Sequence, residues 1–527
     1  MANRWDAIVV GSGFGGAVSA CRLSEAGARV LVLERGRRWS PETYPRGPLA
    51  PWFYAHDAPA KLNGWLDLRV FNRLIIAMGA GVGGGSLCYS SVLLEAPAER
   101  FARGWPSEIQ RDALQPHYDR SKGMLRPRPI PDGQKTRRAM LLARSAEKRG
   151  WSDRYSSVPL AVSFDESWNY DLEGAIDAKH SHPFDNDQGR RQGTCVHLGN
   201  CDIGCDVHAK NTLDLNYLAS AENHGAEIRP LSVVRRLQPD GTGWRVGFDR
   251  IEGGRLIPSE ESADRVILAA GSLGSTELLL RARDDFRTLP GLSARLGRGF
   301  SPNANVLTPD IYPASADIRQ SIGPTITSGL DFGDGSVQGE RFVIQDDGFP
   351  NLLFDVLKAR SDYKPSFQSW LVRQGLKRGV GEPNVLGNVM IWLGAGVDAG
   401  DGQILLHRKL LTFWKKSLAV DWDVRASKGV VDAILETHRQ LSEAGGGELH
   451  VPWFWRLFRG MTTVHPLGGC GMGQSPEDGV VDHRGEVFGH RGLHVLDGST
   501  IPVPIGRNPS LTIAALAERA ADLMIKP

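Results

Sequence analysis

The pattern of apolar and polar positions predicts a strand, a turn, a helix and a second strand at the start of the chain. Four apolar residues at 7–10 are typical of a buried parallel strand. A helical period runs over 17–26 and ends at Gly27. A second apolar strand at 30–33 is followed directly by Glu34. Together these segments predict a complete strand–turn–helix–strand unit that ends in an acidic residue.

The same kinds of pattern recur along the chain. Residues 35–70 are rich in Pro, Trp and Arg without a clear period, which predicts a loop excursion with a short helix. Helical patterns predict helices at 107–125, 135–150 and 210–225 and from 508 onward. Apolar or alternating runs predict strands at 226–229, 231–234, 244–248, 266–270, 341–345, 388–394 and 494–497. Buried strands at both ends of the chain indicate a domain that is built from several separate segments of the chain.

The turn of the first unit carries glycines at the G-x-G-x-x-G spacing. Gly11 permits a tight turn, Gly13 lets backbone approach a pyrophosphate, and Gly16 lets the helix pack closely on the strand. The helix N-terminus then presents free N–H groups and the positive end of its dipole. Glu34, about twenty residues further on, can accept hydrogen bonds from ribose hydroxyls. We therefore predict a dinucleotide site; the alternative is a glycine turn without a ligand.

A second glycine-rich segment follows at 79–86. Its members Gly81, Gly83, Gly84 and Ser86 belong to a run too rich in glycine for a regular strand or helix. Such a run lets backbone lie flat against a planar or phosphorylated ligand. The alternative is a flexible linker, which would carry more serine and charge.

Composition narrows the class of protein. The chain has 527 residues, long enough for two or three domains' worth of core, and its net charge is +2. The near-neutral balance argues against nucleic-acid binding by bulk charge. There is no run of eighteen apolar residues and no leader before the first strand, so we expect a cytoplasmic protein.

One histidine and one asparagine near the C-terminus could carry chemistry. His465 lies between Val464 and Pro466 and is followed by two glycines, at an irregular backbone site. Histidine exchanges a proton near neutral pH. Asn508 precedes Pro509 at a predicted helix start, where its amide can hold a hydroxyl or an oxyanion. The alternative for His465 alone is a hydrogen-bonded core histidine.

These motifs resemble the glucose–methanol–choline (GMC) oxidoreductase family. Within it the chain is most similar to the bacterial cholesterol oxidases that bind FAD non-covalently. The resemblance depends on the first glycine turn, the 81–87 segment and the run at 268–279. It continues through Val464-His-Pro-Leu-Gly-Gly-Cys, Asp497-Gly-Ser-Thr-Ile-Pro and Asn508-Pro. These blocks follow the family order over the whole chain, whereas residues 300–455 show no clear match.

The resemblance implies a role for each matching residue. The ADP half of FAD would be held by Gly11, Gly13, Gly16 and Glu34, with Val234 meeting the adenine through its backbone. The flavin and the pyrophosphate would lie against Gly81, Gly83, Gly84 and Ser86. The ribityl chain and the isoalloxazine ring would face Asp497, Asn508 and Pro509. His465 and Asn508 would be the paired catalytic residues.

The resemblance also implies an α/β fold with two discontinuous domains. A Rossmann-like FAD-binding domain would comprise 1–50, 72–125, 206–310 and 456–527. An α+β substrate-binding domain with a mostly antiparallel sheet and lid loops would comprise 51–71, 126–205 and 311–455.

We expect oxidation of a bulky, apolar, sterol-like alcohol to a ketone or aldehyde by hydride transfer to flavin. Oxygen or an electron carrier would be the final acceptor. One alternative is a flavin-containing lyase, since the superfamily includes members that cleave carbon–carbon bonds in the same pocket. Another is a dehydrogenase that passes electrons to a carrier through a cysteine segment.

That segment contains Cys195, Cys201 and Cys205 within eleven residues. Such spacing in an intracellular chain suggests a metal or cluster more than a disulfide. It resembles a segment that carries a three-iron cluster in some dehydrogenases of the superfamily. The alternatives are a disulfide with a spare thiol, or three reduced structural thiols.

Three stretches at 366–373, 408–416 and 451–459 mix Trp and Phe with Lys and Arg. They suit either a lid that contacts a membrane surface or helices that line the substrate pocket. In either case, aromatic walls indicate a large apolar substrate.

Overall fold

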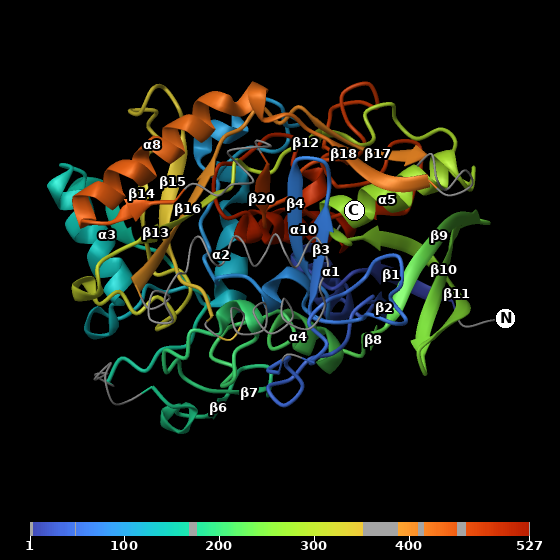
Figure 1. Cartoon of the computed structure of the whole chain (residues 1–527). Coiled ribbons are helices and arrows are strands. Elements are labelled where there is room, and N and C mark those ends of the chain that lie inside the picture. Colours follow the sequence, from blue (N-terminus) through green and yellow to red (C-terminus); the bar gives the residue numbers. More distant parts are fainter. Residues whose placement is uncertain are drawn as a thin grey trace.

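The computed structural model describes residues 4–47, 49–167, 176–350, 352, 388–408, 416–450 and 460–525. Two large sheets dominate it, one at each side of Figure 1, and smaller sheets lie between and around them. Within the described residues no helix combines the length and the apolar character that crossing a membrane requires.

The first large sheet has seven strands and contains the N-terminal unit. Its central strands are parallel, and an antiparallel meander extends it on one side. In spatial order the strands are β8 (Glu227–Arg229), β2 (Val30–Leu33), β1 (Trp5–Val10), β11 (Arg255–Leu268), β10 (Gly243–Glu252) and β9 (Ser232–Asp240), with β21 (Leu493–Val495) also paired to β11. The strand near the C-terminus therefore completes a sheet that the N-terminus begins.

Helices from distant parts of the chain cover this sheet. The first helix, α1 (Phe14–Glu25), packs against α4 (Tyr217–Asn223) and α10 (Ser510–Ile525), and α10 packs against α2 (Gln115–Leu125). On α1, a Cβ placed at Gly16 would lie 2.1 Å from the Gly11 carbonyl oxygen. Gly16 thus has the packing role that the sequence motif predicts.

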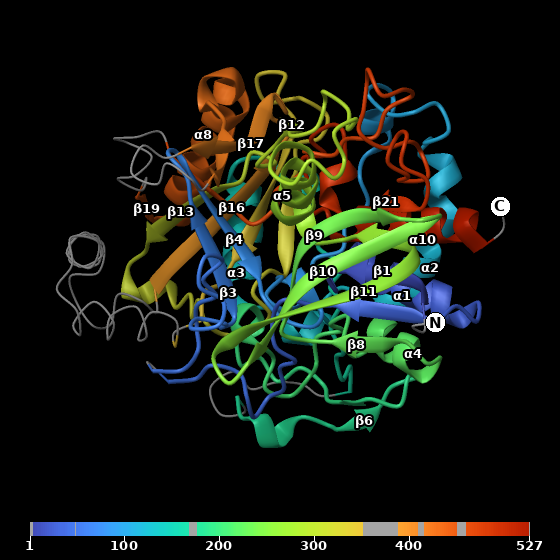
Figure 2. The same ribbon diagram turned by 90° about the vertical axis from the view of Figure 1, so that its right-hand side faces the viewer.

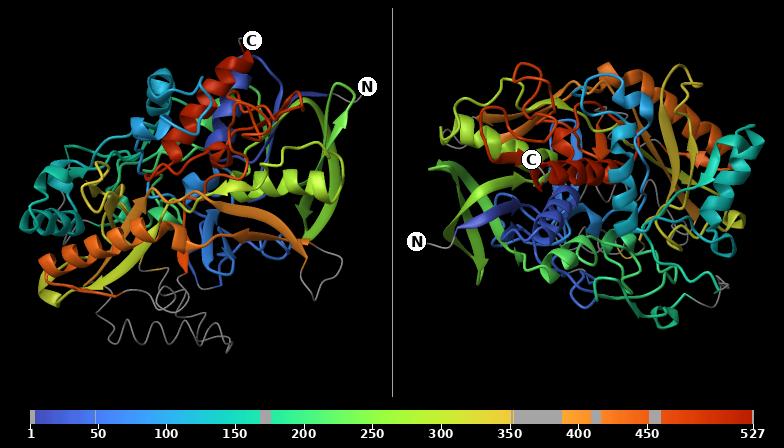
Figure 3. Two further views of the ribbon diagram at one scale, coloured as in Figure 1. Left: turned by 90° about the horizontal axis from the view of Figure 1, so that it is seen from above. Right: turned by 180° about the vertical axis from the view of Figure 1, so that it is seen from behind.

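The second large sheet has six strands, all paired antiparallel. Their order is β19 (Glu448–Leu449), β13 (Val306–Ile311), β16 (Val389–Gly396), β15 (Phe342–Asp347), β14 (Ser328–Asp331) and β5 (Tyr155–Ser157). Two helices, α3 (Arg137–Lys148) and α8 (Lys428–Gly445), pack on it and on each other, as Figure 3 shows from two sides. The expected mostly antiparallel substrate-side sheet is therefore present.

A three-stranded sheet lies between the two large ones in both Figure 1 and Figure 2. It consists of β20 (Met461–Thr463), β4 (Leu74–Gly79) and β3 (Leu66–Val70). Two further small sheets are β12 (Arg298–Phe300) with β17 (Gly402–Arg408) and β18 (Lys416–Asp421), and β6 (Phe184–Asp185) with β7 (Arg191–Gln192). Through β20 and β4, the segment before His465 runs parallel to the segment before the second glycine-rich run.

Several elements differ from the sequence expectation. The short helix expected in 35–70 is absent from the described residues of that segment, which instead ends in β3. The helix expected at 107–125 begins only at Gln115, because Pro116 suits a first turn and not a helix interior. The helix expected at 210–225 begins at Tyr217, whose N–H receives a cap from the Asn216 side chain.

The close approach at Gly16 generates a stability prediction. Gly16→Ala should lower the free energy of unfolding by about 3 kcal/mol, the upper range for overpacking, because the new Cβ meets backbone that cannot move aside. Gly123→Ala is the matched control, since nothing lies within 4 Å of a Cβ at this position in α2. It should be neutral or stabilising by about 0.5 kcal/mol. Denaturant unfolding of both variants checks this, and equal midpoints would contradict the packing argument.

Candidate functional site

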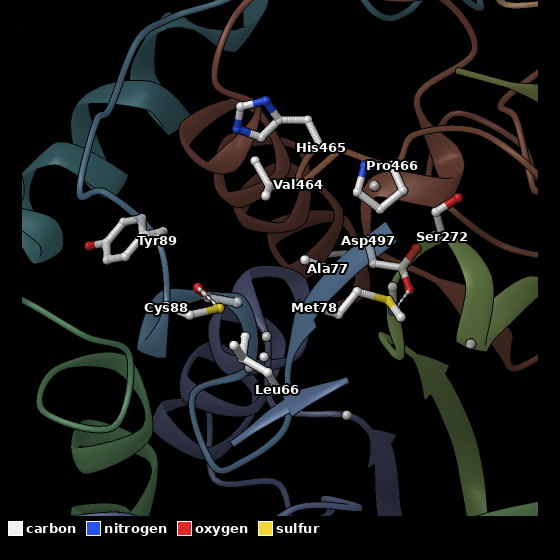
Figure 4. A pocket seen from close by; sticks show the side chains of 18 of the residues that line it. Leu66, Ala77, Met78, Cys88, Tyr89, Ser272, Val464, His465, Pro466 and Asp497 are labelled. Carbon is white, nitrogen blue, oxygen red and sulfur yellow. Dashed lines mark hydrogen bonds between the residues drawn. The ribbon is translucent and has the colours of Figure 1, made fainter. Parts of the chain in front are cut away.

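A cavity of about 860 Å³ lies between the two large sheets and is lined by residues from N-terminal, central and C-terminal segments of the chain. In Figure 4, Val464, His465 and Pro466 lie along one side of it, and Cys88 and Tyr89 lie at one end. Apolar atoms dominate its walls. Its size and its few polar groups are those of a site for a small molecule or cofactor.

The N-terminus of α1 opens onto this cavity. Gly13 is the N-cap, and within the described chain no side chain caps the helix and no acidic residue lies in its first turn. Gly13, Gly85 and Gly271 all line the cavity, and a Cβ at any of the three would meet no described atom within 4 Å. The backbone here is open to a ligand, and a helix N-terminus of this kind attracts a phosphate.

Glu34 lies at the end of β2 and lines the cavity while only 4% exposed. One of its carboxylate oxygens accepts from the Ser12 N–H (3.0 Å) and hydroxyl (2.7 Å), and the other accepts from the Gly36 N–H (2.9 Å). These bonds hold the carboxylate at the tip of the glycine turn, where the sequence motif predicts a ribose.

Val234 lies at an irregularity in β9. Val234 pairs with Phe248 and Arg236 pairs with Gly247, so Arg235 has no partner in the β10 ladder. Such a bulge turns local backbone groups out of the regular ladder. Ser232 to Arg235 all line the cavity, so this edge is the place where an adenine could meet backbone.

Only part of the second glycine-rich segment lines the cavity, and the rest lies behind the cavity wall. Gly84 lines the cavity, whereas Gly81, Gly83 and Ser86 do not. A Cβ at Gly81 would lie 2.5 Å from the Trp39 ring. The Gly83 N–H donates to the Ser12 hydroxyl, and the Ser86 hydroxyl joins the Gly83 carbonyl to the Leu213 N–H. Direct contact of these three with a cofactor stays a prediction, and the contacts they do make brace the segment.

Asp497 connects the cavity to the start of α5 (Gly271–Asp284). One carboxylate oxygen accepts from the Gly271 N–H (2.9 Å) and the Ser275 hydroxyl (2.6 Å), and the other accepts from the Ser499 N–H and hydroxyl. Burial raises the pKa of this carboxyl. The four donors hold Asp497 in place on the cavity wall.

The His465 ring is oriented by Asn305, a residue that the sequence did not single out. The Asn305 amide nitrogen lies 3.0 Å from His465 Nδ1. The amide cannot be turned around, because its oxygen accepts from the Val464 N–H (3.3 Å), which can only donate. Nδ1 is therefore an acceptor, and the neutral ring carries its proton on Nε2. Burial lowers the pKa of His465 to about 4, so the ring is neutral at physiological pH.

Asn508 forms a hydrogen bond with Gln345 of β15. The Gln345 amide donates to Asn508 Oδ1 at 3.0 Å, which leaves the Asn508 NH₂ group available as a donor. Asn508, Pro509, Ser510 and Ile513 line the cavity at the N-terminus of α10, whose dipole favours negative charge. His465 and Asn508 thus both face the cavity as donors. Neither Asn305 nor Gln345 lies in a motif, and only the folded arrangement identifies them.

The cysteine segment shows no arrangement for a metal. No group of three or more His, Cys, Asp or Glu among the described residues could hold an ion. Cys195, Cys201 and Cys205 carry free thiols, and burial raises the pKa of Cys195 and that of Cys201, the latter to about 11. Their free state is that of the reduced structural thiols that were one alternative.

Of the aromatic–basic stretches, 366–373 and 451–459 and most of 408–416 lie outside the described residues. The lid and membrane-contact interpretations stay predictions.

The cavity fits FAD by the chemistry of its walls. An uncapped helix N-terminus suits a pyrophosphate, Glu34 suits ribose hydroxyls, and three open glycines let backbone approach a planar ring. These features come from segments far apart in sequence and surround one space.

Comparison with known proteins agrees with this geometry. Family models described as GMC oxidoreductase match residues 5–282 and 425–517. Cholesterol oxidases from Mycobacterium tuberculosis and Acinetobacter baumannii are 31% and 28% identical, over 98% of this chain and 91% and 93% of theirs. A long-chain-alcohol oxidase from Arabidopsis thaliana is 24% identical over 98% of this chain and 66% of its own.

The crystal structure of pyridoxine 4-oxidase from Mesorbium loti shares the fold, with a TM-score of 0.62 and 18% identity over 99% of both chains. Family models, relatives and fold all agree. The chain therefore belongs to the GMC oxidoreductase family of FAD-binding flavoproteins and is an oxidoreductase acting on CH–OH donors.

Proposed function

We propose that this enzyme oxidises a bulky, mostly apolar alcohol of sterol-like size to a ketone or aldehyde. The observation that carries the proposal is the pair of oriented donors, His465 and Asn508, on the wall of an otherwise apolar cavity. The names of the relatives, cholesterol oxidases and a long-chain-alcohol oxidase, support an apolar alcohol over a free sugar.

FAD would be held by the α1 N-terminus with Gly11, Gly13 and Gly84, by Glu34, by the Val234 edge of β9, and by Asp497 and Pro509. When bound, it supplies the acceptor for the hydride that leaves the carbinol carbon. The apolar walls exclude water from the reacting centre, which strengthens every hydrogen bond made there.

We assign His465 and Asn508 to the carbinol oxygen. The hydride would leave the carbinol carbon and the hydroxyl proton would pass to water, while His465 Nε2–H and the Asn508 NH₂ group both donate to the oxygen and stabilise the negative charge left on it. A role for His465 Nε2 as proton acceptor would require the ring proton on Nδ1. Asn305 would then have to turn its NH₂ group away and lose its bond to the Val464 N–H.

An anaerobic screen of sterols, terpenoid alcohols, long-chain alcohols and sugars, read by loss of flavin absorbance, tests the proposal. Bleaching by apolar alcohols and not by sugars is expected. A substrate consumed without bleaching would indicate a lyase. A low yield of hydrogen peroxide beside rapid dye reduction would favour an electron carrier over oxygen as acceptor. The proposal includes no iron–sulfur cluster, and iron analysis of anaerobically purified protein checks that choice.

Removing the imidazole should separate cofactor binding from turnover. We expect His465→Ala to keep FAD bound and to lower kcat by about 10²–10⁴-fold, because one of the two donors at the reacting oxygen is lost. His224→Ala, at the far end of α4, is the control and should retain full activity. Turnover of His465→Ala within threefold of the wild type would remove His465 from the mechanism.

Asn305→Asp distinguishes the donor role of His465 from a base role. The new carboxylate would accept from Nδ1–H, remove the proton from Nε2 and raise the pKa of His465 above its present value of about 4. If Nε2 donates, kcat should fall by about 10²-fold at neutral pH. It should recover as the pH falls below the raised pKa of His465, because the protonated ring again carries a proton on Nε2. An unchanged or faster turnover would instead identify His465 as the base.

A further inference from the structure

One wall of the cavity is the face of the six-stranded sheet that looks toward the seven-stranded sheet. Leu307 and Pro309 of β13 and Ile391 and Leu393 of β16 all line the cavity. Leu307 pairs with Leu393, and Pro309 pairs with Ile391. Asp347 of β15 pairs with Ile391 on its other side and also lines the cavity. An acidic side chain therefore continues a row of apolar ones.

The Asp347 carboxyl is buried at this wall. The residue is 9% exposed, and none of the described residues forms a hydrogen bond or an ion pair with its side chain. Its neighbour Asp346 differs, because side chains alternate along a strand and Asp346 points to the opposite face. There it accepts four hydrogen bonds from Thr327 and Ser328 and lies near Arg138. Asp346 has a structural explanation and Asp347 does not.

A second carboxyl reaches the same region from a different segment. Asp202 lines the cavity, and one of its oxygens accepts from the Ser90 hydroxyl (3.4 Å) and the Thr325 hydroxyl (3.3 Å). Burial raises the pKa of Asp202 to about 6. Burial and the charge of Asp202 together raise the pKa of Asp347 well above its ordinary value. The two carboxyls are close enough to influence each other.

Two cations, Lys210 and Arg138, act on this group of carboxyls. Lys210 donates to two backbone carbonyl oxygens and its charge acts on Asp202, while the Arg138 guanidinium acts on Asp346. Arg138 also acts on Asp347, but burial and the charges of Asp202 and Asp346 oppose it and favour the neutral acid. A neutral carboxyl offers one O–H donor and one acceptor, which is the complement of a hydroxyl group and not of an ammonium group.

The position of Asp347 relates it to the reacting centre. Gln345 lies two residues before it, on the same face of β15, and donates to Asn508. Two residues along a strand span about 6.6 Å. A substrate whose carbinol oxygen is held by Asn508 would therefore extend along the apolar wall toward Asp347.

We propose that Asp347, with Asp202 beside it, binds a second, uncharged oxygen function on the substrate, so that the preferred substrate is an apolar alcohol carrying another hydroxyl group away from the reacting carbon. This inference rests on the proposed alcohol oxidation and narrows its substrate class. A mono-alcohol leaves the buried carboxyl without a partner, which costs affinity, whereas the second hydroxyl satisfies it.

The test measures kcat/KM of the wild type and of Asp347→Leu on three ten-carbon compounds: n-decanol, the corresponding α,ω-diol and the corresponding α,ω-amino alcohol. The same three compounds with a six-carbon chain are measured as well. The wild type should oxidise one of the two diols with a kcat/KM at least about tenfold above its mono-alcohol. Asp347→Leu should lose this preference while its activity on the mono-alcohol stays the same or rises. Asp421→Leu, at the end of β18, is the control and should keep the wild-type ratio.

Each other outcome overturns the inference. Equal kcat/KM for diol and mono-alcohol in the wild type would show that Asp347 does not discriminate. Preference for the amino alcohol would show a cation site in place of a hydroxyl site. A proportional loss on all substrates with a lower melting temperature would assign Asp347 a structural role. A changed spectrum of the bound flavin in Asp347→Leu would place the carboxyl against the cofactor.

Failure of the alcohol-oxidation proposal is distinguishable from failure of this one. If no alcohol is oxidised by the wild type, calorimetric titration of diol and mono-alcohol into the wild type and Asp347→Leu still measures the subsite. Tighter binding of the diol that disappears in Asp347→Leu would support the subsite by itself. Equal binding of diol and mono-alcohol would remove it.

Discussion

The structure depends on one close approach between the two ends of the chain. A Cβ at Gly15 of α1 would lie 1.4 Å from the Leu496 carbonyl oxygen, so the helix can contact the C-terminal segment here only through glycine. The contact sets the N-terminus of α1 beside Asp497, which in turn binds the start of α5. One backbone contact therefore brings together three segments that are hundreds of residues apart and forms the side of the cavity that we propose holds the cofactor.

The other side of the cavity is built on a different principle. Its antiparallel sheet presents flat rows of apolar side chains, and polar groups enter these rows at single positions such as Gln345 and Asp347. Helix ends and glycines suit a ligand rich in phosphate and hydroxyl groups, whereas a flat apolar sheet suits a bulky hydrophobic molecule. The two sheets thus match the proposed sites: the seven-stranded sheet suits the cofactor and the six-stranded sheet suits an apolar substrate.

The proposed reacting groups, His465 and Asn508, lie where the two sides meet, and each forms a hydrogen bond with a residue from the six-stranded-sheet side. Asn305 directs the proton of His465 to Nε2, and Gln345 directs the NH₂ group of Asn508 toward the cavity. Asn305 precedes β13 and Gln345 belongs to β15 of the six-stranded sheet, whereas His465 and Asn508 come from the C-terminal segments. Any shift between these parts would change the hydrogen-bonding character of the pair, which links the packing of the whole molecule to its chemistry.

The sequence by itself determined the βαβ unit, the family and the antiparallel character of the second sheet. Gly11, Gly13, Gly16 and Glu34 signalled their positions because short-range spacing and apolar runs directly encode a strand, a tight turn and a helix. The periodicity of apolar residues did not predict that two helices begin at Gln115 and Tyr217, because a proline and a capping side chain determine those helix starts. Only the tertiary structure showed that Ser86 braces the glycine segment from behind and that Asn305 and Gln345 bond to His465 and Asn508, the proposed reacting pair. It also showed that the buried Asp347 carboxyl has no partner among the residues the structure describes. These properties arise from contacts between residues more than a hundred positions apart, for which no local pattern exists.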